Sequence, residues 1–266
     1  MIYEINKLPT TIAKLRSTST ENKNKLHLMY NLNPAQYFYL IKDCKRLDLI
    51  DRFLAQPDIT PAKVVGLANI TGHDPKYAEV FIKRKKWHDC IYYAEHVYQD
   101  PKIIEAIAKP GCRYKFKYLY CRDVEDLEIM WRALAVPNPK AYRWQVEYCR
   151  YVKDREEMWK VLATNTHNPE PLYAYCLSVN DREEIWKALA KSTDINAPTF
   201  QYFYCINVTD REEIWRALAS CSEEHCAYWQ YLYYTQVKPR REMWKAIISN
   251  PHPEAKTWRN RLLRGE

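Results

Sequence analysis

Glycine is scarce in this chain of 266 residues, which contains four: Gly66, Gly72, Gly111 and Gly265. Because they are isolated from one another, none belongs to a glycine-rich loop of the kind that cradles phosphates or dinucleotides. The shortage also disfavours an ordinary all-β fold with tight hairpin turns. Phenylalanine is sparse as well, with 6 residues against 22 Tyr and 9 Trp. The fold therefore has to accommodate many amphipathic rings.

The motifs of common enzymes are missing too. The chain has no H-E-x-x-H, no G-x-S-x-G and no phosphate loop, and its seven histidines are scattered. We therefore expect no enzymatic activity, no catalytic residues and no cofactor. There is no C-x-x-C pair among the nine cysteines, so we expect no bound metal. Cys221, His225 and Cys226 lie close together but lack a fourth ligand, which favours ordinary helix packing.

No run resembles a signal peptide, and no stretch reaches the roughly 18–20 apolar residues of a membrane span. We therefore expect a cytoplasmic protein without a membrane partner. In a reducing compartment its thiols should stay free.

The charge is moderately basic, with 41 Lys and Arg against 33 Asp and Glu. Residues 1–113 hold 18 of these cations and 12 of the anions, whereas residues 114–266 hold 23 and 21. The excess suits nucleic acid or an acidic protein surface. Its densest run is Lys83, Arg84, Lys85 and Lys86 beside Trp87, which could meet phosphates. The alternative is a solvated segment between repeats.

The dominant feature is an internal repeat. Five tryptophans recur at spacings of 28, 27, 29 and 29 residues: Trp131, Trp159, Trp186, Trp215 and Trp244. With each Trp taken as position 0, tyrosine recurs at −11, valine at −7 and, in four units, cysteine at −10. Most of these repeated residues are expected in the core.

Weaker copies around Asp51, Ala78 and Ile104 extend the pattern to about eight units of roughly 28 residues. We divide the chain into an N-terminal cap or partly disordered segment (1–33), diverged basic repeats (34–113), regular Trp-containing repeats (114–250) and a C-terminal capping helix (251–266). The cations of that last helix, Lys256, Arg259, Arg261 and Arg264, give the array a polar end.

Each unit is predicted to be two helices. In the second half, Asp154, Asp181 and Asp210 each precede a Glu by three residues, as in a capping box. In the first half, the alternation of Tyr142, Trp144 and Val146 would suit a strand. The Asn-Pro pairs that open these segments are helix-start signals, and they favour a helix instead.

A single short hairpin cannot bury its apolar face, so the units should stack. The fold class is therefore all-α: an α-solenoid forming a right-handed superhelix. At the level of the broad class it resembles HEAT-like and tetratricopeptide-like arrays. A long, repeated, aromatic-rich surface without a catalytic constellation predicts a non-enzymatic scaffold that binds macromolecules.

A row of tyrosines at position −13 is the main binding candidate: Tyr118, Tyr173, Tyr202 and Tyr231. Arg122 and Arg150 at position −9 lie near it on a helical wheel. Such a face could anchor a protein or stack bases. The alternative is that the tyrosines pack against the next unit.

The predicted function is a protein–protein interaction module. The alternative is a nucleic-acid-binding solenoid that uses the basic half and the Tyr/Arg face. The sequence predicts neither the partner's identity nor the oligomeric state.

Overall fold

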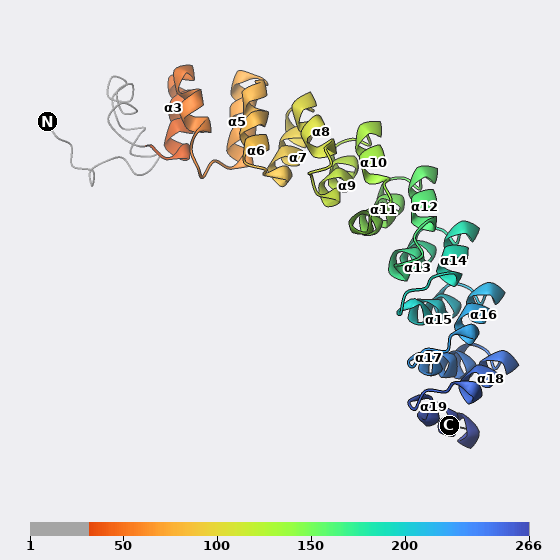
Figure 1. Ribbon diagram of the computed structural model, residues 1–266. Helices are drawn as coiled ribbons and strands as arrows, with labels where there is room; N and C mark the ends of the chain where they lie inside the picture. The colour runs from red at the N-terminus through yellow and green to blue at the C-terminus, as the bar shows by residue number, and fades with distance from the viewer. Residues whose placement is uncertain (1–31, 266) are drawn as a thin grey trace, which may run out of the picture. The chain divides into compact units, whose positions relative to one another are not determined.

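The computed structural model describes residues 32–265, which form seventeen α-helices and no β-strand (Figure 1). The predicted all-α fold of stacked hairpins is confirmed, and the strand alternative is excluded for this range. Residues 1–31, and with them most of the predicted N-terminal cap, lie outside the described residues. Residue contacts divide the chain into two compact units between Cys112 and Arg113.

The N-terminal unit contains three helix pairs within residues 32–112. They are α3 (Pro34–Cys44) with α4 (Ile50–Leu54), α5 (Pro61–Thr71) with α6 (Pro75–Lys83), and α7 (Trp87–His96) with α8 (Pro101–Ala108). A short 3₁₀ turn, Leu47–Leu49, leads into α4.

The C-terminal unit contains five pairs and a closing helix. They are α9 (Tyr114–Asp123) with α10 (Glu128–Leu134), α11 (Pro139–Tyr151) with α12 (Glu156–Ala163), α13 (Pro169–Ser178) with α14 (Glu183–Ala190), α15 (Ala197–Asn207) with α16 (Glu212–Ser220), α17 (Cys226–Leu232) with α18 (Arg241–Ser249), and α19 (Ala255–Arg264). A π-helical turn, Tyr233–Val237, extends α17.

Within this unit the first helices of successive pairs form one row and the second helices form another, as Figure 1 shows from α9 to α19. Helix α19 packs on α17 and α18, so it continues the first-helix row beyond the last pair. The C-terminal unit thus consists of two layers of short helices, as expected when a small hairpin can bury its apolar side only against its neighbours.

The Asn-Pro pairs begin helices, as the sequence predicts, and two Asp-Pro pairs do so as well. Asn138 and Asn168 are N-caps whose side chains accept a hydrogen bond from the backbone N–H two residues later, with proline in the first helical position. Asp74 and Asp100 do the same for α6 and α8. Proline has no N–H to leave unpaired there, and its fixed φ suits the first turn.

The predicted capping boxes at Asp154, Asp181 and Asp210 are wrong. The N-cap positions of α12, α14 and α16 are occupied by arginines, Arg155 in the first of them, and no side chain caps these helices. The aspartates lie one residue earlier and turn toward the following unit instead.

These aspartates form an inter-repeat joint, which we define as four side chains shared by two consecutive units. In one joint, the hydroxyl of Tyr175 donates to Asp154 at 2.6 Å, and Nε of Arg182 donates to the same hydroxyl at 2.7 Å. Nη2 of Arg182 also pairs with Asp154, and its guanidinium lies 5.0 Å from the Trp159 ring. Asp and Trp come from one unit, and Tyr and Arg from the next.

The joint recurs four times in the C-terminal unit. The sets are Asp126–Trp131–Tyr148–Arg155, Asp154–Trp159–Tyr175–Arg182, Asp181–Trp186–Tyr204–Arg211 and Asp210–Trp215–Tyr233–Arg240. All four tyrosines are fully buried. A buried hydroxyl that both donates and accepts is fully satisfied, so each joint fixes how one unit sits on the next.

A glutamine that recurs at position −14 in three units, Gln145, Gln201 and Gln230, adds a second link. Nε2 of Gln145 donates to the carbonyls of Leu134 and Val136 at 2.8 Å each, which closes the C-terminal end of α10. Gln230 does the same for α16. Each of these amides thus bonds two carbonyl groups at or just beyond the end of the preceding helix.

Candidate binding surface

The tyrosines at position −13 pack against the following unit. Tyr118 stacks on Trp144 with ring centroids 5.7 Å apart, Tyr202 meets Trp229 at 5.4 Å, and Tyr231 meets Trp258 at 5.2 Å. Each partner ring lies on the next first helix, so the rings form a ladder along the row.

This packing leaves three of the four rings little exposed area: Tyr118, Tyr202 and Tyr231 are buried. Tyr173 is half-buried between Phe200 and Phe203. The expectation of an open stacking face is therefore wrong for the three buried rings, because these rings pack against the next unit, as the alternative interpretation stated. A binding role for Tyr173 stays a prediction.

A different set of residues points away from the second helices. Positions −16, −12 and −9 of each first helix are spaced i, i+4 and i+7, so they share one helical face. We call this set the outward column. Its members are Lys115, Leu119 and Arg122 on α9; Arg143, Glu147 and Arg150 on α11; Glu170, Ala174 and Leu177 on α13; Thr199, Phe203 and Ile206 on α15; and Tyr228, Leu232 and Thr235 on α17.

Helix α19 extends the same register. Trp258 contacts Tyr231 as Trp229 contacts Tyr202, which makes these two tryptophans equivalent. The outward column on α19 is therefore Thr257, Arg261 and Arg264.

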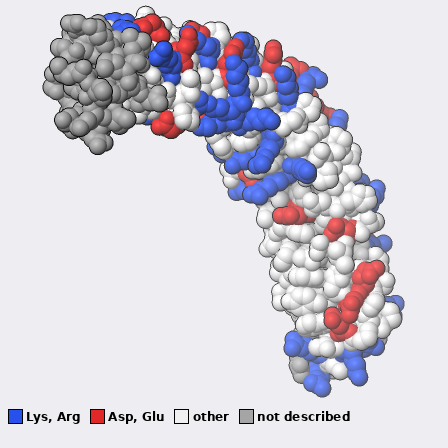
Figure 2. All heavy atoms as spheres, turned by 60° about the vertical axis from the view of Figure 1, so that its left-hand side comes forward, with Lys and Arg blue, Asp and Glu red and all other residues white. Residues whose placement is uncertain are grey.

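The character of the outward column changes along the row. It carries four cations and one carboxylate, Glu147, on α9 and α11, is largely uncharged and apolar on α13, α15 and α17, and is cationic again on α19. The uncharged part, which we call the neutral strip, includes Leu177 at 51% exposure, Ile206 at 42% and Tyr228 at 36%. In Figure 2 the C-terminal unit shows a mostly white expanse, broken by a few carboxylates, between blue groups at its two ends.

The arginines of α9 and α11 differ in how they are held. Arg122 pairs with Asp123 at 2.6 Å and lies 5.4 Å from the Tyr118 ring. Arg143 and Arg150 are exposed and lie over Trp144 and Tyr151, and within residues 32–265 neither forms an ion pair with a carboxylate. The predicted Arg150 thus keeps its full charge toward solvent.

The basic run of the N-terminal unit is partly structural. Arg84 is half-buried, and its Nη2 donates to the carbonyls of Leu54 and Gln56 at 3.1 and 2.8 Å. Lys83 pairs with Glu79 at 3.3 Å. The expectation that the whole run faces a partner is therefore wrong at Arg84, whose charge ties two loops together.

The rest of that run bends at a turn. Lys85 has a positive φ of 53°, and Lys86 precedes the first residue of α7, Trp87, which is half-buried. Lys85 and Lys86 are exposed. These two lysines stay candidate contacts, as predicted.

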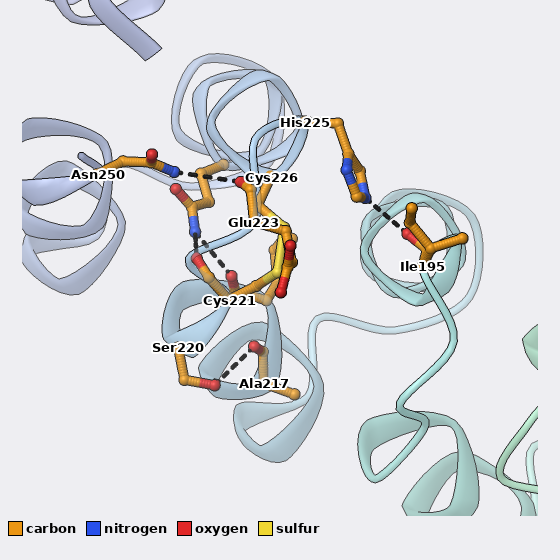
Figure 3. Close-up of a disulfide and its surroundings, with 10 residues drawn as sticks. Ile195, Ala217, Ser220, Cys221, Glu223, His225, Cys226 and Asn250 are labelled. Carbon is orange, nitrogen blue, oxygen red and sulfur yellow. Dashed lines mark hydrogen bonds between the residues drawn. A yellow bond between two sulfur atoms is a disulfide. The ribbon is translucent and has the colours of Figure 1, made fainter. Parts of the chain in front are cut away.

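Cys221 and Cys226 form a disulfide across the loop between α16 and α17 (Figure 3). The expectation that all thiols stay free is wrong for this pair. His225 does not join them: its Nε2 lies 2.6 Å from the carbonyl oxygen of Ile195. The carbonyl of Cys221 accepts from Gln230, so the bridge sits where the Gln230 link fastens the helix end. The cytoplasmic location stays a prediction.

A cavity of about 440 Å³ adjoins this bridge. It lies between two loops, with Thr193 and Asp194 on one side and Cys221 and Glu223 on the other. Its lining contains no histidine, and within residues 32–265 no three His, Cys, Asp or Glu side chains gather as a metal site would need.

The free cysteines of the repeat are poor nucleophiles. Burial raises the pKa of Cys121 and of Cys149 to about 12, so the thiolate is rare at neutral pH. Their positions in the core agree with the packing role predicted from the repeat.

Comparison with models of protein families, with curated proteins and with solved structures finds no match. The fold alone therefore defines the class: a helical-repeat protein of stacked hairpins. None of the described helices is long and apolar enough to cross a membrane.

The sequence analysis missed both the joint and the neutral strip. The joint had a visible signal, because Asp at −5 and Arg at −4 recur with the Tyr and Trp. The strip had one too: positions −16, −12 and −9 are the variable positions of the first helix, and reading them unit by unit reveals the change of charge.

Proposed function

We propose that this protein is a non-enzymatic scaffold, of the same broad class as HEAT-like and tetratricopeptide-like arrays, that binds another protein through the first-helix face of its C-terminal unit. The observation that carries the proposal is the exposure of Leu177, Ile206 and Tyr228, which all belong to the outward column of three successive first helices. Scattered exposed apolar residues are ordinary, but an aligned group of them is typical of an interaction site.

Nucleic acid fits this part of the face less well. Binding along a phosphate backbone needs Lys or Arg at intervals along the path. Helices α13, α15 and α17 contain no Lys or Arg, so a strand crossing them would meet no cation. The nucleic-acid alternative rests on Arg143 and Arg150 beside Trp144 and on the exposed Lys85 and Lys86.

The experiment compares two variants of the full chain, each carrying a photoreactive group. Both are exposed to a nuclease-treated lysate of the source organism. Leu177→Glu with Ile206→Glu places charges in the strip. Ile129→Glu is the matched control, because Ile129 is similarly exposed at 49% but belongs to the second-helix layer. Loss of the same cross-linked proteins in the strip variant, with retention in the control, supports the proposal; identical capture by both removes this face.

The alternative is tested separately with single- and double-stranded DNA and RNA at two salt concentrations. Phosphate binding falls steeply as salt rises. Absence of binding at low salt removes the nucleic-acid alternative.

A further inference from the structure

We infer that the partner segment recognised by the outward column is acidic at both ends and apolar in the middle: an extended peptide whose side chains cover the neutral strip while its carboxylates meet the arginines on either side. This inference rests on the proposed function and specifies its ligand.

The first argument is charge complementarity at the two ends of the strip. On the N-terminal side, Arg143 and Arg150 are exposed, and no carboxylate within residues 32–265 pairs with either. On the C-terminal side, Arg261 is exposed and lies over Trp258 at 5.0 Å. The planar guanidinium of an arginine offers N–H donors from which a carboxylate can accept two hydrogen bonds.

The second argument is the composition of the middle. Leu177, Phe203, Ile206, Tyr228 and Leu232 lie along the strip, and the three helices that carry them contain one carboxylate in total, Glu170. Removing such a surface from water favours apolar contacts and disfavours a charged group without a partner. Acidic residues are therefore excluded from the centre of the ligand as firmly as they are favoured at its ends.

Geometry sets the length of the ligand. Packed helices lie about 8–10 Å apart, and four such steps separate α11 from α19, so the two cationic ends are about 32–40 Å apart. An extended chain at about 3.3 Å per residue crosses this distance with roughly 10–12 residues. A single helix at 1.5 Å per residue would need more than about 20.

Charge argues against two occupants from this chain itself. Residues 1–31 hold five Lys and Arg against two Glu, so this segment is basic rather than acidic. A second copy carries a formal net charge of +8, which opposes close approach to the cationic ends.

The test selects phage-displayed random 16-residue peptides on the immobilised full-length protein at low salt. A selected peptide is then synthesised with a fluorescent label, and its dissociation constant is measured by anisotropy. The sequences are expected to place Asp or Glu on both sides of apolar or aromatic residues.

Matched variants locate the peptide. Arg143→Gln with Arg150→Gln should weaken binding about tenfold and flatten its salt dependence, and Arg261→Gln should act in the same direction. Leu177→Glu with Ile206→Glu should weaken it by more than about tenfold, because it places two carboxylates under the apolar residues. Ile129→Glu should leave it unchanged.

Each contrary result has a definite meaning. Selected peptides without acidic ends, or binding that the strip variant abolishes and the arginine variants leave intact, overturn the inference but leave the proposed function standing. Binding that neither set of variants alters overturns both. Displacement of the labelled peptide by a synthetic peptide of residues 1–31 or by single-stranded RNA assigns the strip to that occupant and overturns the inference. A dimer of the protein that Leu177→Glu dissociates assigns the strip to a second copy and overturns it as well.

Discussion

The two units place different residue types at the same repeat positions. In the C-terminal unit, position −5 carries Asp and position −4 of the next unit carries Arg, with the −11 tyrosine between them. In the N-terminal unit, His73 stands at −5 and Asp100 at −4, and the hydroxyl of Tyr93 lies 2.9 Å from Nδ1 of His73. Nε2 of His73 is 3.5 Å from Asp100.

The first helix of the C-terminal unit has no such joint. Tyr120 occupies the −11 position of α9, but within residues 32–265 its buried hydroxyl has no hydrogen-bond partner, and the −4 residue of its unit is Leu127. The comparison teaches that the repeat preserves a place for a polar joint rather than a fixed set of residues. A tyrosine ring can keep its packing role after its polar partners have gone.

The largest expected effect comes from replacing the residue at position 0 with alanine. Trp186→Ala removes a buried ring and the surface on which Arg211 lies, so the free energy of unfolding should fall by about 4 kcal/mol. Ile104→Ala, at the same position in the N-terminal unit, removes a smaller, half-buried side chain and should cost about 1–2 kcal/mol. Urea unfolding followed by circular dichroism measures both. Equal losses would show that position 0 contributes no more in the regular repeats than in the diverged ones.

The next effect tests the joint itself. Asp154→Ala leaves the guanidinium of Arg182 without its carboxylate and Tyr175 without its acceptor, at a cost of about 2 kcal/mol. His73→Ala removes the hydrogen-bond partner of the Tyr93 hydroxyl and should cost about 1 kcal/mol. The same unfolding experiment applies. If Asp154→Ala leaves the free energy of unfolding unchanged, the joint adds no stability beyond that of helix packing.

A smaller effect with opposite signs separates Tyr175 from Tyr120. Tyr175→Phe breaks two hydrogen bonds and should lower stability by about 1 kcal/mol. Tyr120→Phe removes a buried hydroxyl that has no partner, so it should leave stability unchanged or raise it by up to about 1 kcal/mol. The two variants share one chemical change, and each controls for the other. A comparable loss in both would mean that the Tyr120 hydroxyl has a partner in solution.

The smallest effects are expected at exposed ion pairs. Glu183 pairs with Lys187 within one helix, whereas Glu79 reaches Lys102 of another helix at 2.6 Å as well as Lys83 of its own. Both carboxylates are exposed to solvent, which screens such pairs. Glu183→Gln and Glu79→Gln should leave the unfolding midpoint unchanged within error. A clear shift for Glu79→Gln alone would show that bridging two helices outweighs screening.

Much of the fold was predictable because it is repeated. Five copies of Trp, Tyr and Val at fixed offsets indicated the hairpin, and the Asn-Pro pairs indicated where helices such as α11 and α13 begin. The prediction for the aspartates before the second helices was wrong, because Asp followed by Glu after three residues has the pattern of a capping box. Only the packing of the next unit reveals that Asp154 bonds to Tyr175 and Arg182 instead.

The candidate site was harder to predict for a related reason. Tyr118 and Tyr202 repeat in sequence because each contacts its successor, so their repetition reflects stacking rather than ligand binding. A residue such as Leu177 or Arg150, at one position with different neighbours in each unit, gives no repeat signal. The disulfide between Cys221 and Cys226 occurs in one unit and had no pattern to reveal it.

Because each inter-repeat joint is shared by two consecutive units, one whole unit can be removed or duplicated without losing the joints that remain. Removal of residues 155–181 would join Asp154 directly to Arg182, and Asp126, Trp131 and Tyr148 would then receive Arg182 in place of Arg155. Asp154 would in turn face Tyr204 and Arg211, so every remaining joint keeps four members. Such a shortened chain should retain a cooperative helical unfolding transition, measurable by circular dichroism, whereas a cut of about half that length, which removes one helix of a pair, should not. Duplication of the same segment also leaves every joint with four members. Arrays of this kind can therefore become longer or shorter during evolution without a new type of contact between units.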